Sequence, residues 1–222
     1  MRWLTLFLFP LLICSVCFGQ ATLLKPGENG FTGGLSISRN KNATAGGLHL
    51  GAIIGGKVDL GVGIGRVSGR GVTGSVYAFN FTGYPIRAGT GKKNASIGVG
   101  VGVEAVKSES SGYYYSRSTT ETYPKVGVGL SANLRADRSL LVQPIIGYTR
   151  IINEKIQNRD FGEIGLTLAF GASNKDLFAI SSGILLSGDV PTVFVGVRII
   201  FRKNSEKSIP DDYTGGKIKW ED

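Results

Sequence analysis

Apolar residues alternate with small or polar residues along most of the chain, and the 3.6-residue repeat of an amphipathic helix is nearly absent. The stretch ASIGVGVGVEAV (95–106) shows the alternation most clearly, because isoleucine or valine occupies every second position and glycine most of the others. A period of two predicts β-strands, since successive strand side chains point to opposite faces. We predict ten strands, over residues 31–39, 46–54, 57–66, 72–81, 95–106, 125–135, 140–150, 162–171, 177–186 and 192–201.

Turn-forming residues separate these segments, as in Gly55-Gly56 and Ser187-Gly188-Asp189. Short strands at near-even spacing are typical of a β-sandwich or a β-barrel, and they argue against alternating βα units.

The two faces of the predicted strands differ in a way that favours a barrel in a membrane. One face is aliphatic, with Val99, Val101 and Val103 as examples, whereas the other is mostly glycine, with Gly98 and Gly100 as examples. A water-soluble sandwich normally carries polar residues on its outer face. In a small barrel the aliphatic face meets lipid, and glycines in the narrow lumen leave room for larger neighbours. A buried sandwich strand and an elastin-like or fibre-forming segment are the alternatives.

The first 19 residues have the features of a cleaved signal peptide. Arg2 precedes a short apolar run, and Cys17-Phe18-Gly19 places small residues at the cleavage site. A membrane-spanning helix is the alternative, but the run is too short for one and Pro10 interrupts it. Both cysteines lie in this segment. Without them, the processed chain has neither a disulfide scaffold nor a thiolate metal site.

The signal segment, the ten alternating segments and the final TVFVGVRIIF (192–201) resemble the small outer-membrane β-barrel proteins of Gram-negative bacteria. The resemblance implies an all-β fold, a single antiparallel up-and-down transmembrane barrel of ten strands, with eight as the alternative. It also implies the bacterial outer membrane as location. The family usually ends its last strand with an aromatic residue, and Phe201 fits that role. Residues 20–201 would form the barrel, and the polar residues 202–222 a periplasmic tail.

An even strand number implies that both termini are periplasmic and that odd-numbered strands run outward. The polar segments 107–123 and 152–161 are then expected to be outer loops, and 82–94 a periplasmic connection. Five phenylalanines fall at periplasmic strand ends, at the alternate positions whose side chains point toward lipid, which we call lipid-facing parity. Aromatic rings prefer to lie at such membrane interfaces. The five phenylalanines are Phe31, Phe81, Phe170, Phe178 and Phe201.

The formal net charge of +9 suggests partners that carry phosphate. For an exported protein these are lipid headgroups, and we predict no nucleic-acid partner. Four bases with lipid-facing parity end outward-running strands and are called the rim bases: Arg39, Arg66, Lys107 and Arg150. We expect them to bind the phosphates of lipopolysaccharide, because arginine binds phosphate with two parallel hydrogen bonds. Alternatively, they only reach water, as long basic side chains do at any interface.

Five charged residues have inward parity and are called the lumen charges: Asp59, Glu104, Arg135, Glu163 and Arg198. Asp59 and Arg135 could pair near the periplasmic end. Glu104 and Glu163 lie near the outer end, where they could attract cations to a narrow pore. In the other interpretation, these charges form a buried network that fills the lumen.

Candidate chemistry is sparse. His49 is the only histidine, and it has no companion motif. We therefore predict no catalytic, metal or cofactor site, and no enzyme. The stretch GYYYSRSTTETY (112–123) is the most distinctive segment, because tyrosine and serine are favoured in binding loops. Tyr113, Tyr114 and Tyr115 would then contact an extracellular ligand, although an ordinary surface loop accounts for the composition as well.

The sequence thus predicts a structural or surface-binding outer-membrane protein. A narrow pore and a secreted soluble β-sandwich are the alternatives.

Overall fold

The computed structural model describes residues 21–69, 72–87, 95–111, 116–136, 139–152, 159–171, 176–187 and 191–203. The strands are β1 (Asn29–Arg39), β2 (Thr44–Ile54), β3 (Val58–Gly69), β4 (Val72–Ile86), β5 (Ala95–Ser111), β6 (Ser116–Ala132), β7 (Leu134–Arg135), β8 (Leu140–Ile151), β9 (Arg159–Phe170), β10 (Leu177–Leu186) and β11 (Thr192–Lys203). The 3-10 helix η2 (Ala21–Leu23) precedes them. Among these described residues, no helix is long and apolar enough to cross a bilayer. The predicted signal segment and residues 204–222 lie outside them.

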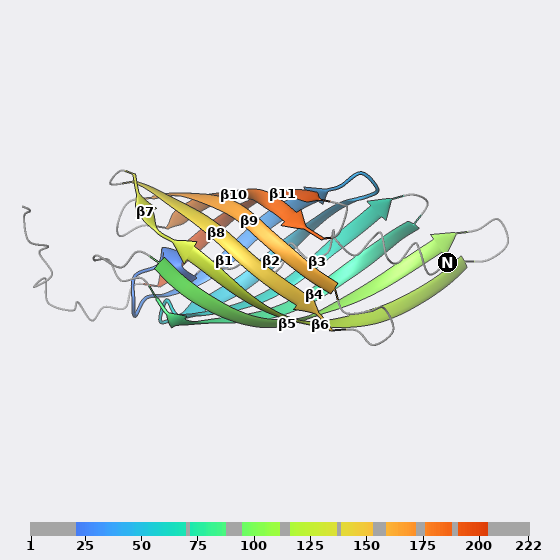
Figure 1. The fold of residues 1–222 in the computed structure, drawn as a ribbon, viewed down its shortest axis with the longest axis horizontal. Helices are drawn as coiled ribbons and strands as arrows, with labels where there is room; N and C mark the ends of the chain where they lie inside the picture. Colours follow the sequence, from blue (N-terminus) through green and yellow to red (C-terminus); the bar gives the residue numbers. More distant parts are fainter. Residues whose placement is uncertain are drawn as a thin grey trace, which may run out of the picture.

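The strands form one closed antiparallel barrel (Figure 1). Neighbours in sequence pair with each other, β1 pairs with β11, and β6 closes the ring by pairing with β8. The two-residue strand β7 continues β6 after Asn133 and also pairs with β8. The wall therefore has ten strands. This confirms the predicted ten-strand up-and-down barrel and excludes eight strands, a sandwich and a fibre.

The register gives the dimensions of the barrel. Following cross-strand partners from Ile97 in β5 once around the wall leads back to β5 at Glu109, twelve residues farther along. Twelve residues of stagger across ten strands correspond to a strand tilt of about 40° and a backbone radius of about 10 Å. A barrel of this radius leaves a lumen that side chains from its own wall can fill.

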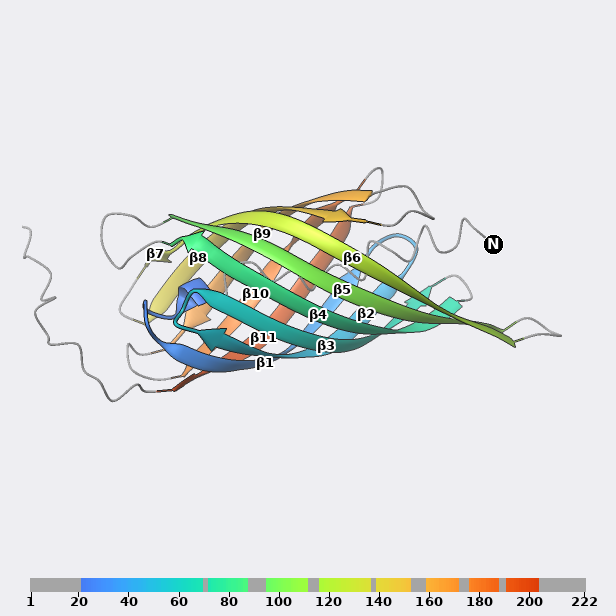
Figure 2. The same cartoon turned by 90° about the horizontal axis from the view of Figure 1, so that it is seen from below.

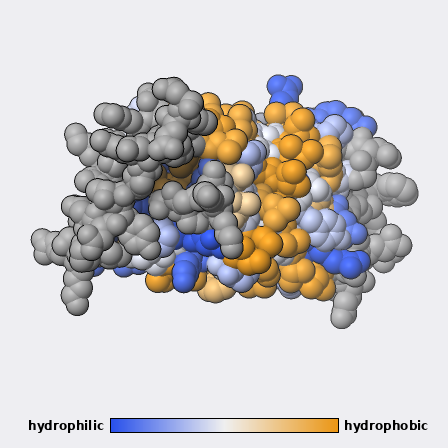
Figure 3. All heavy atoms as spheres, turned by 60° about the vertical axis from the view of Figure 1, so that its left-hand side comes forward, coloured by the Kyte–Doolittle hydropathy of each residue, from blue (hydrophilic) through white to orange (hydrophobic). Residues whose placement is uncertain are grey.

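Aliphatic side chains cover the outside of the wall. Val62 and Val101 are each 52% exposed, and Ile164 is 57% exposed. On the face shown in Figure 3, hydrophobic residues cover the middle of the barrel and hydrophilic residues lie on either side of them. Such an apolar wall is expected to face lipid.

Four of the five predicted phenylalanines, Phe31, Phe170, Phe178 and Phe201, point outward at one end of the barrel. The fifth, Phe81, lies farther along the wall, directly opposite Val101, because β4 continues past it to Ile86. Phe31 is directly opposite Phe201, and Phe178 is directly opposite Phe170. Along β1, eight residues separate Phe31 from Arg39, which corresponds to about 20 Å along the barrel axis. This approaches the roughly 25 Å height of the apolar band of outer-membrane barrels.

Glycine on the inner face makes room for side chains of neighbouring strands. A Cβ atom added to Gly34 would lie 2.5 Å from Cε1 of His49. At Gly102 it would lie 2.8 Å from Cε of Lys125, and at Gly183 2.6 Å from Cζ of Phe194. The glycines that alternate with aliphatic residues thus allow large groups to share a narrow lumen.

The structure corrects three of the predicted connections. The expected outer loop 107–123 is mostly a β-hairpin, because β5 continues to Ser111 and β6 begins at Ser116. Likewise, β4 continues to Ile86, and β9 already begins at Arg159. The last strand ends at Lys203, two residues beyond the predicted end of the barrel.

The β5–β6 hairpin projects beyond the other strands at one end of the barrel, here called the hairpin end (Figures 1 and 2). Its outer part is rich in serine and threonine, and the hydroxyls of Ser108 and Thr119 are 2.8 Å apart. The first and last described residues, Ala21 and Lys203, belong to the opposite end, here called the terminal end.

Candidate functional site

Two layers of buried apolar side chains cross the lumen. The hairpin-end layer lies close to the rim bases, since Val67, Val106 and Ile151 are each adjacent in sequence to one of them. Its members are Ala43, Ala45, Val67, Val76, Val106, Tyr123, Ile151, Phe161 and Leu185, with Phe194 packed against it. Tyr123 and Phe161 are each 1% exposed, although the sequence placed both in loops.

The terminal-end layer lies at the level of the phenylalanines. Its members are Ala21, Leu23, Leu24, Ile53, Tyr84, Ala169, Leu177, Ala179 and Ile200, with Leu141 packed against it. The first three come from the segment before β1, which folds into the barrel. Sequence patterning gave no sign of this, because the segment is too short to show any period.

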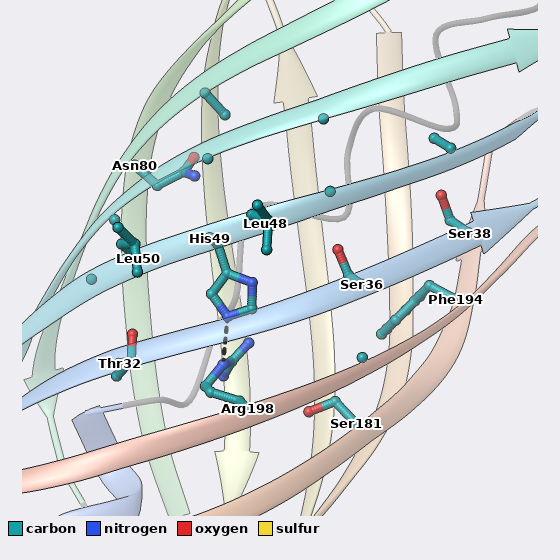
Figure 4. A pocket seen from close by; sticks show the side chains of 18 of the residues that line it. Thr32, Ser36, Ser38, Leu48, His49, Leu50, Asn80, Ser181, Phe194 and Arg198 are labelled. Atoms are coloured by element: carbon teal, nitrogen blue, oxygen red, sulfur yellow. Dashed lines mark hydrogen bonds between the residues drawn. The ribbon is translucent and has the colours of Figure 1, made fainter.

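Between the layers is a cavity of about 140 Å³ that is lined by apolar groups together with several polar and charged side chains. Thr32, Ser36, His49 and Arg198 are among the residues around it, and Phe194 lies at one side (Figure 4). The Nε of Arg198 donates a hydrogen bond of 3.0 Å to Nε2 of His49. Because an arginine Nε only donates, this histidine nitrogen carries no proton and the imidazole is neutral. Gly34, which lies between the two residues in the sheet, leaves the space that the imidazole occupies.

Asp59 connects the cavity to the terminal-end layer. Its Oδ2 accepts hydrogen bonds from the backbone N–H of Ala21, at 2.9 Å, and from the Tyr84 hydroxyl, at 3.0 Å. Its Oδ1 is buried and has no hydrogen-bond partner among the described residues. The predicted partner, Arg135, has a side chain that lies outside the described part of the structure. The carboxylate of Asp59 therefore holds the segment before β1.

A buried ion pair lies near the hairpin-end layer. Nζ of Lys125 is 2.7 Å from Oε1 of Glu104, and both side chains are 1% exposed. Glu163 lines the cavity nearby. Because the ammonium of Lys125 binds Glu104, the two glutamates do not form an open acidic mouth. Sequence reasoning missed Lys125, although it shares the inward parity of Gly127 and Gly129.

The rim bases all lie exposed on the outside of the wall. Arg66 and Lys107 share a cross-strand row through Ser75. Two of the four bases have acidic neighbours that the sequence did not indicate: Arg150 lies 3.4 Å from Asp160, and Lys107 lies 3.2 Å from Glu109. Such half-exposed pairs contribute little to stability. The tyrosines of the predicted outer binding loop, Tyr113, Tyr114 and Tyr115, lie outside the described residues.

No group of three or more metal-ligating side chains occurs within the part of the chain that the structure describes.

Comparison with known proteins identifies a fold and no family. No family model matches the chain, and neither does any curated protein. The match to the β domain of the Bordetella autotransporter BrkA spans 78% of this chain and 98% of that domain, with 9% identity and a TM-score of 0.50. The match to the translocator domain of the autotransporter NalP from Neisseria meningitidis spans 79% of this chain and 88% of that domain, with 11% identity and a TM-score of 0.49. The match to the N-terminal β-barrel domain of Pseudomonas aeruginosa OprF spans 79% of this chain and 99% of that domain, with 12% identity and a TM-score of 0.44.

The chain has the fold of the outer-membrane β-barrel proteins. At such low identities the likeness concerns the fold alone, so any role of the barrel must be argued from its own lumen and surface.

Proposed function

We propose that this chain is a non-enzymatic integral protein of the bacterial outer membrane, with a closed lumen, that presents the β5–β6 hairpin to a ligand or surface outside the cell. In this proposal the hairpin end faces outward and the terminal end faces the periplasm. The outer-membrane fold and the aliphatic wall support the location.

The observation that carries the proposal is the filled lumen. Tyr123 and Phe161 cross it at the hairpin end, and Leu23 and Leu24 cross it at the terminal end. Apolar constrictions of this kind exclude water and therefore ions. This favours a binding or structural role over the narrow pore.

The hairpin supplies the surface for binding. β5 continues past the rim base Lys107 to Ser111, four residues or about 10 Å farther along the barrel axis. Residues 116–123 of β6 pair with β5 only, within the described part of the chain, because β8 pairs with β6 from Lys125 onward. A ribbon with one unpaired edge is able to accept an additional strand from a partner. The rim bases would meanwhile bind lipopolysaccharide phosphates.

Conductance tests the closed lumen. The purified barrel in a planar bilayer is expected to carry no steady current, because an apolar layer crosses the lumen at each end. A steady current through the parent barrel would overturn the proposal in favour of the pore.

Labelling of single cysteines tests the orientation. Both native cysteines lie in the predicted signal segment, so an introduced one is unique in the processed chain. In intact cells a bulky impermeant maleimide should label Thr119→Cys on the hairpin and spare Lys57→Cys in the β2–β3 turn. The opposite pattern would mean that the hairpin faces the periplasm.

A further inference from the structure

The two apolar layers of the lumen are built differently. Every member of the hairpin-end layer lies in a strand, except Ala43 in the short β1–β2 connection. Those side chains cannot leave the lumen unless strands separate. In the terminal-end layer, Ala21, Leu23 and Leu24 belong to no strand. Residues 21–24 are here called the plug.

Side chains of the wall hold the plug in place. Asp59 accepts a hydrogen bond from the N–H of Ala21. Two wall residues donate to Thr22, both at 2.6 Å: Nδ2 of Asn133 donates to its carbonyl, and Nε2 of Gln143 donates to its hydroxyl. A fourth wall residue, Arg87, donates to the carbonyl of Leu24. Burial lowers the pKa of the Arg87 guanidinium, and the carboxylates of Glu28 and Asp59 act in the opposite direction. All four wall groups are side chains, so the plug can leave without breaking a backbone hydrogen bond between strands.

The connection from the plug to the barrel is suited to a hinge. Lys25–Glu28 separates Leu24 from the start of β1, and the N–H of Glu28 donates to the carbonyl of Lys25. Gly27 has φ of 87°, a backbone conformation that glycine adopts without strain. On the other side, the predicted cleavage site after Gly19 would leave a free chain end one residue before Ala21.

We propose that the plug is displaceable, and that its departure opens the central cavity to the periplasm while the hairpin-end layer keeps the outer end closed. The cavity then becomes a periplasm-facing binding site. The groups that the plug vacates define the chemistry of its occupant: Asp59 would accept an N–H, and Asn133, Gln143 and Arg87 would donate to carbonyl or hydroxyl oxygens. Together with the apolar side chains around Leu23, these groups fit a short peptide segment with small and aliphatic residues.

Cysteine accessibility in detergent tests the proposal. Ser36→Cys places a thiol at the central cavity (Figure 4). A charged methanethiosulfonate reagent is expected to modify this thiol slowly in the parent chain and about tenfold or more faster when residues 21–24 are deleted. Thr119→Cys on the hairpin reports reagent activity and should react equally fast in both backgrounds. The gel mobility of the unheated barrel shows that each variant is folded.

Two substitutions in the full-length chain keep the test decisive if the deletion fails to fold. Asp59→Ala removes the acceptor of the Ala21 N–H, and Leu23→Glu makes the plug costly to bury, so both should expose Ser36→Cys. The matched control is Asp160→Ala, which removes an exposed carboxylate and should leave the protection unchanged. Equal modification rates in the parent and all plug variants would overturn the proposal.

Conductance separates this proposal from the closed-lumen function. The plug variants should expose Ser36→Cys and still carry no steady current, because the hairpin-end layer remains in place. A steady current in the plug variants alone would refute the statement that only the periplasmic end opens. A current in the parent would refute the closed lumen itself.

Discussion

Breaking the buried ion pair between Lys125 and Glu104 should destabilise the barrel strongly. The 2.7 Å contact lies between side chains that are each 1% exposed, so neither charge can be solvated once its partner is gone. Removing one member of such a pair costs about 3–5 kcal/mol, whereas replacing both by uncharged residues of similar size is often close to neutral. We therefore expect Lys125→Met and Glu104→Gln each to lower the free energy of unfolding by that amount. The double variant should recover most of the loss.

Urea titration of the barrel in detergent measures these free energies, with the gel mobility of the unheated sample reporting the folded fraction. Arg150→Gln provides the control, because its pair with Asp160 is about half exposed and should contribute less than about 1 kcal/mol. If the effects of the two buried substitutions add to within about 0.5 kcal/mol, the two charges are not coupled and the reasoning is refuted.

Three further outcomes are expected. Val101→Arg should reduce assembly into the membrane, measured as the heat-modifiable fraction, because an arginine at mid-depth of the lipid face costs about 2–4 kcal/mol; normal assembly would contradict the lipid-facing assignment. Gly34→Ala should lower the melting temperature, because the new Cβ would lie 2.5 Å from the His49 ring, whereas Gly33→Ala, with its nearest neighbour at 3.5 Å, should be tolerated. Changing all four rim bases to glutamine should reduce the lipopolysaccharide retained on purification and the lipid-dependent rise in melting temperature, and unchanged values would disprove the phosphate site.

The wall of the barrel could be predicted from the sequence because one face of each strand must be apolar to meet lipid. That requirement imposes the period of two, which assigned residues such as Val62 and Ile164 to the outside. The turn at Gly55-Gly56 was equally predictable, and both glycines have positive φ. By contrast, the outer part of the β5–β6 hairpin contacts no lipid, so Ser108 and Thr119 carry no alternating pattern.

The contents of the lumen were less predictable, because parity gives a direction and no partner. The alternation along each strand predicted that Asp59 and Arg198 point inward, but the contacts of these side chains depend on which strands pair to close the ring. Arg198 reaches His49 because β1, which lies between β2 and β11, has glycine at position 34. The contact of Asp59 with Ala21 joins a strand to a segment that has no pattern at all.

The ring closes through residues 125–131 of β6, so the register of the wall does not depend on the length of the hairpin above them. Paired residues can be added to both arms beyond Ser110, where β4 no longer pairs with β5, without altering the stagger of twelve. Natural variation in length should therefore accumulate in this hairpin sooner than in the wall. For the same reason, the hairpin is a suitable place to insert an epitope or a foreign peptide for display.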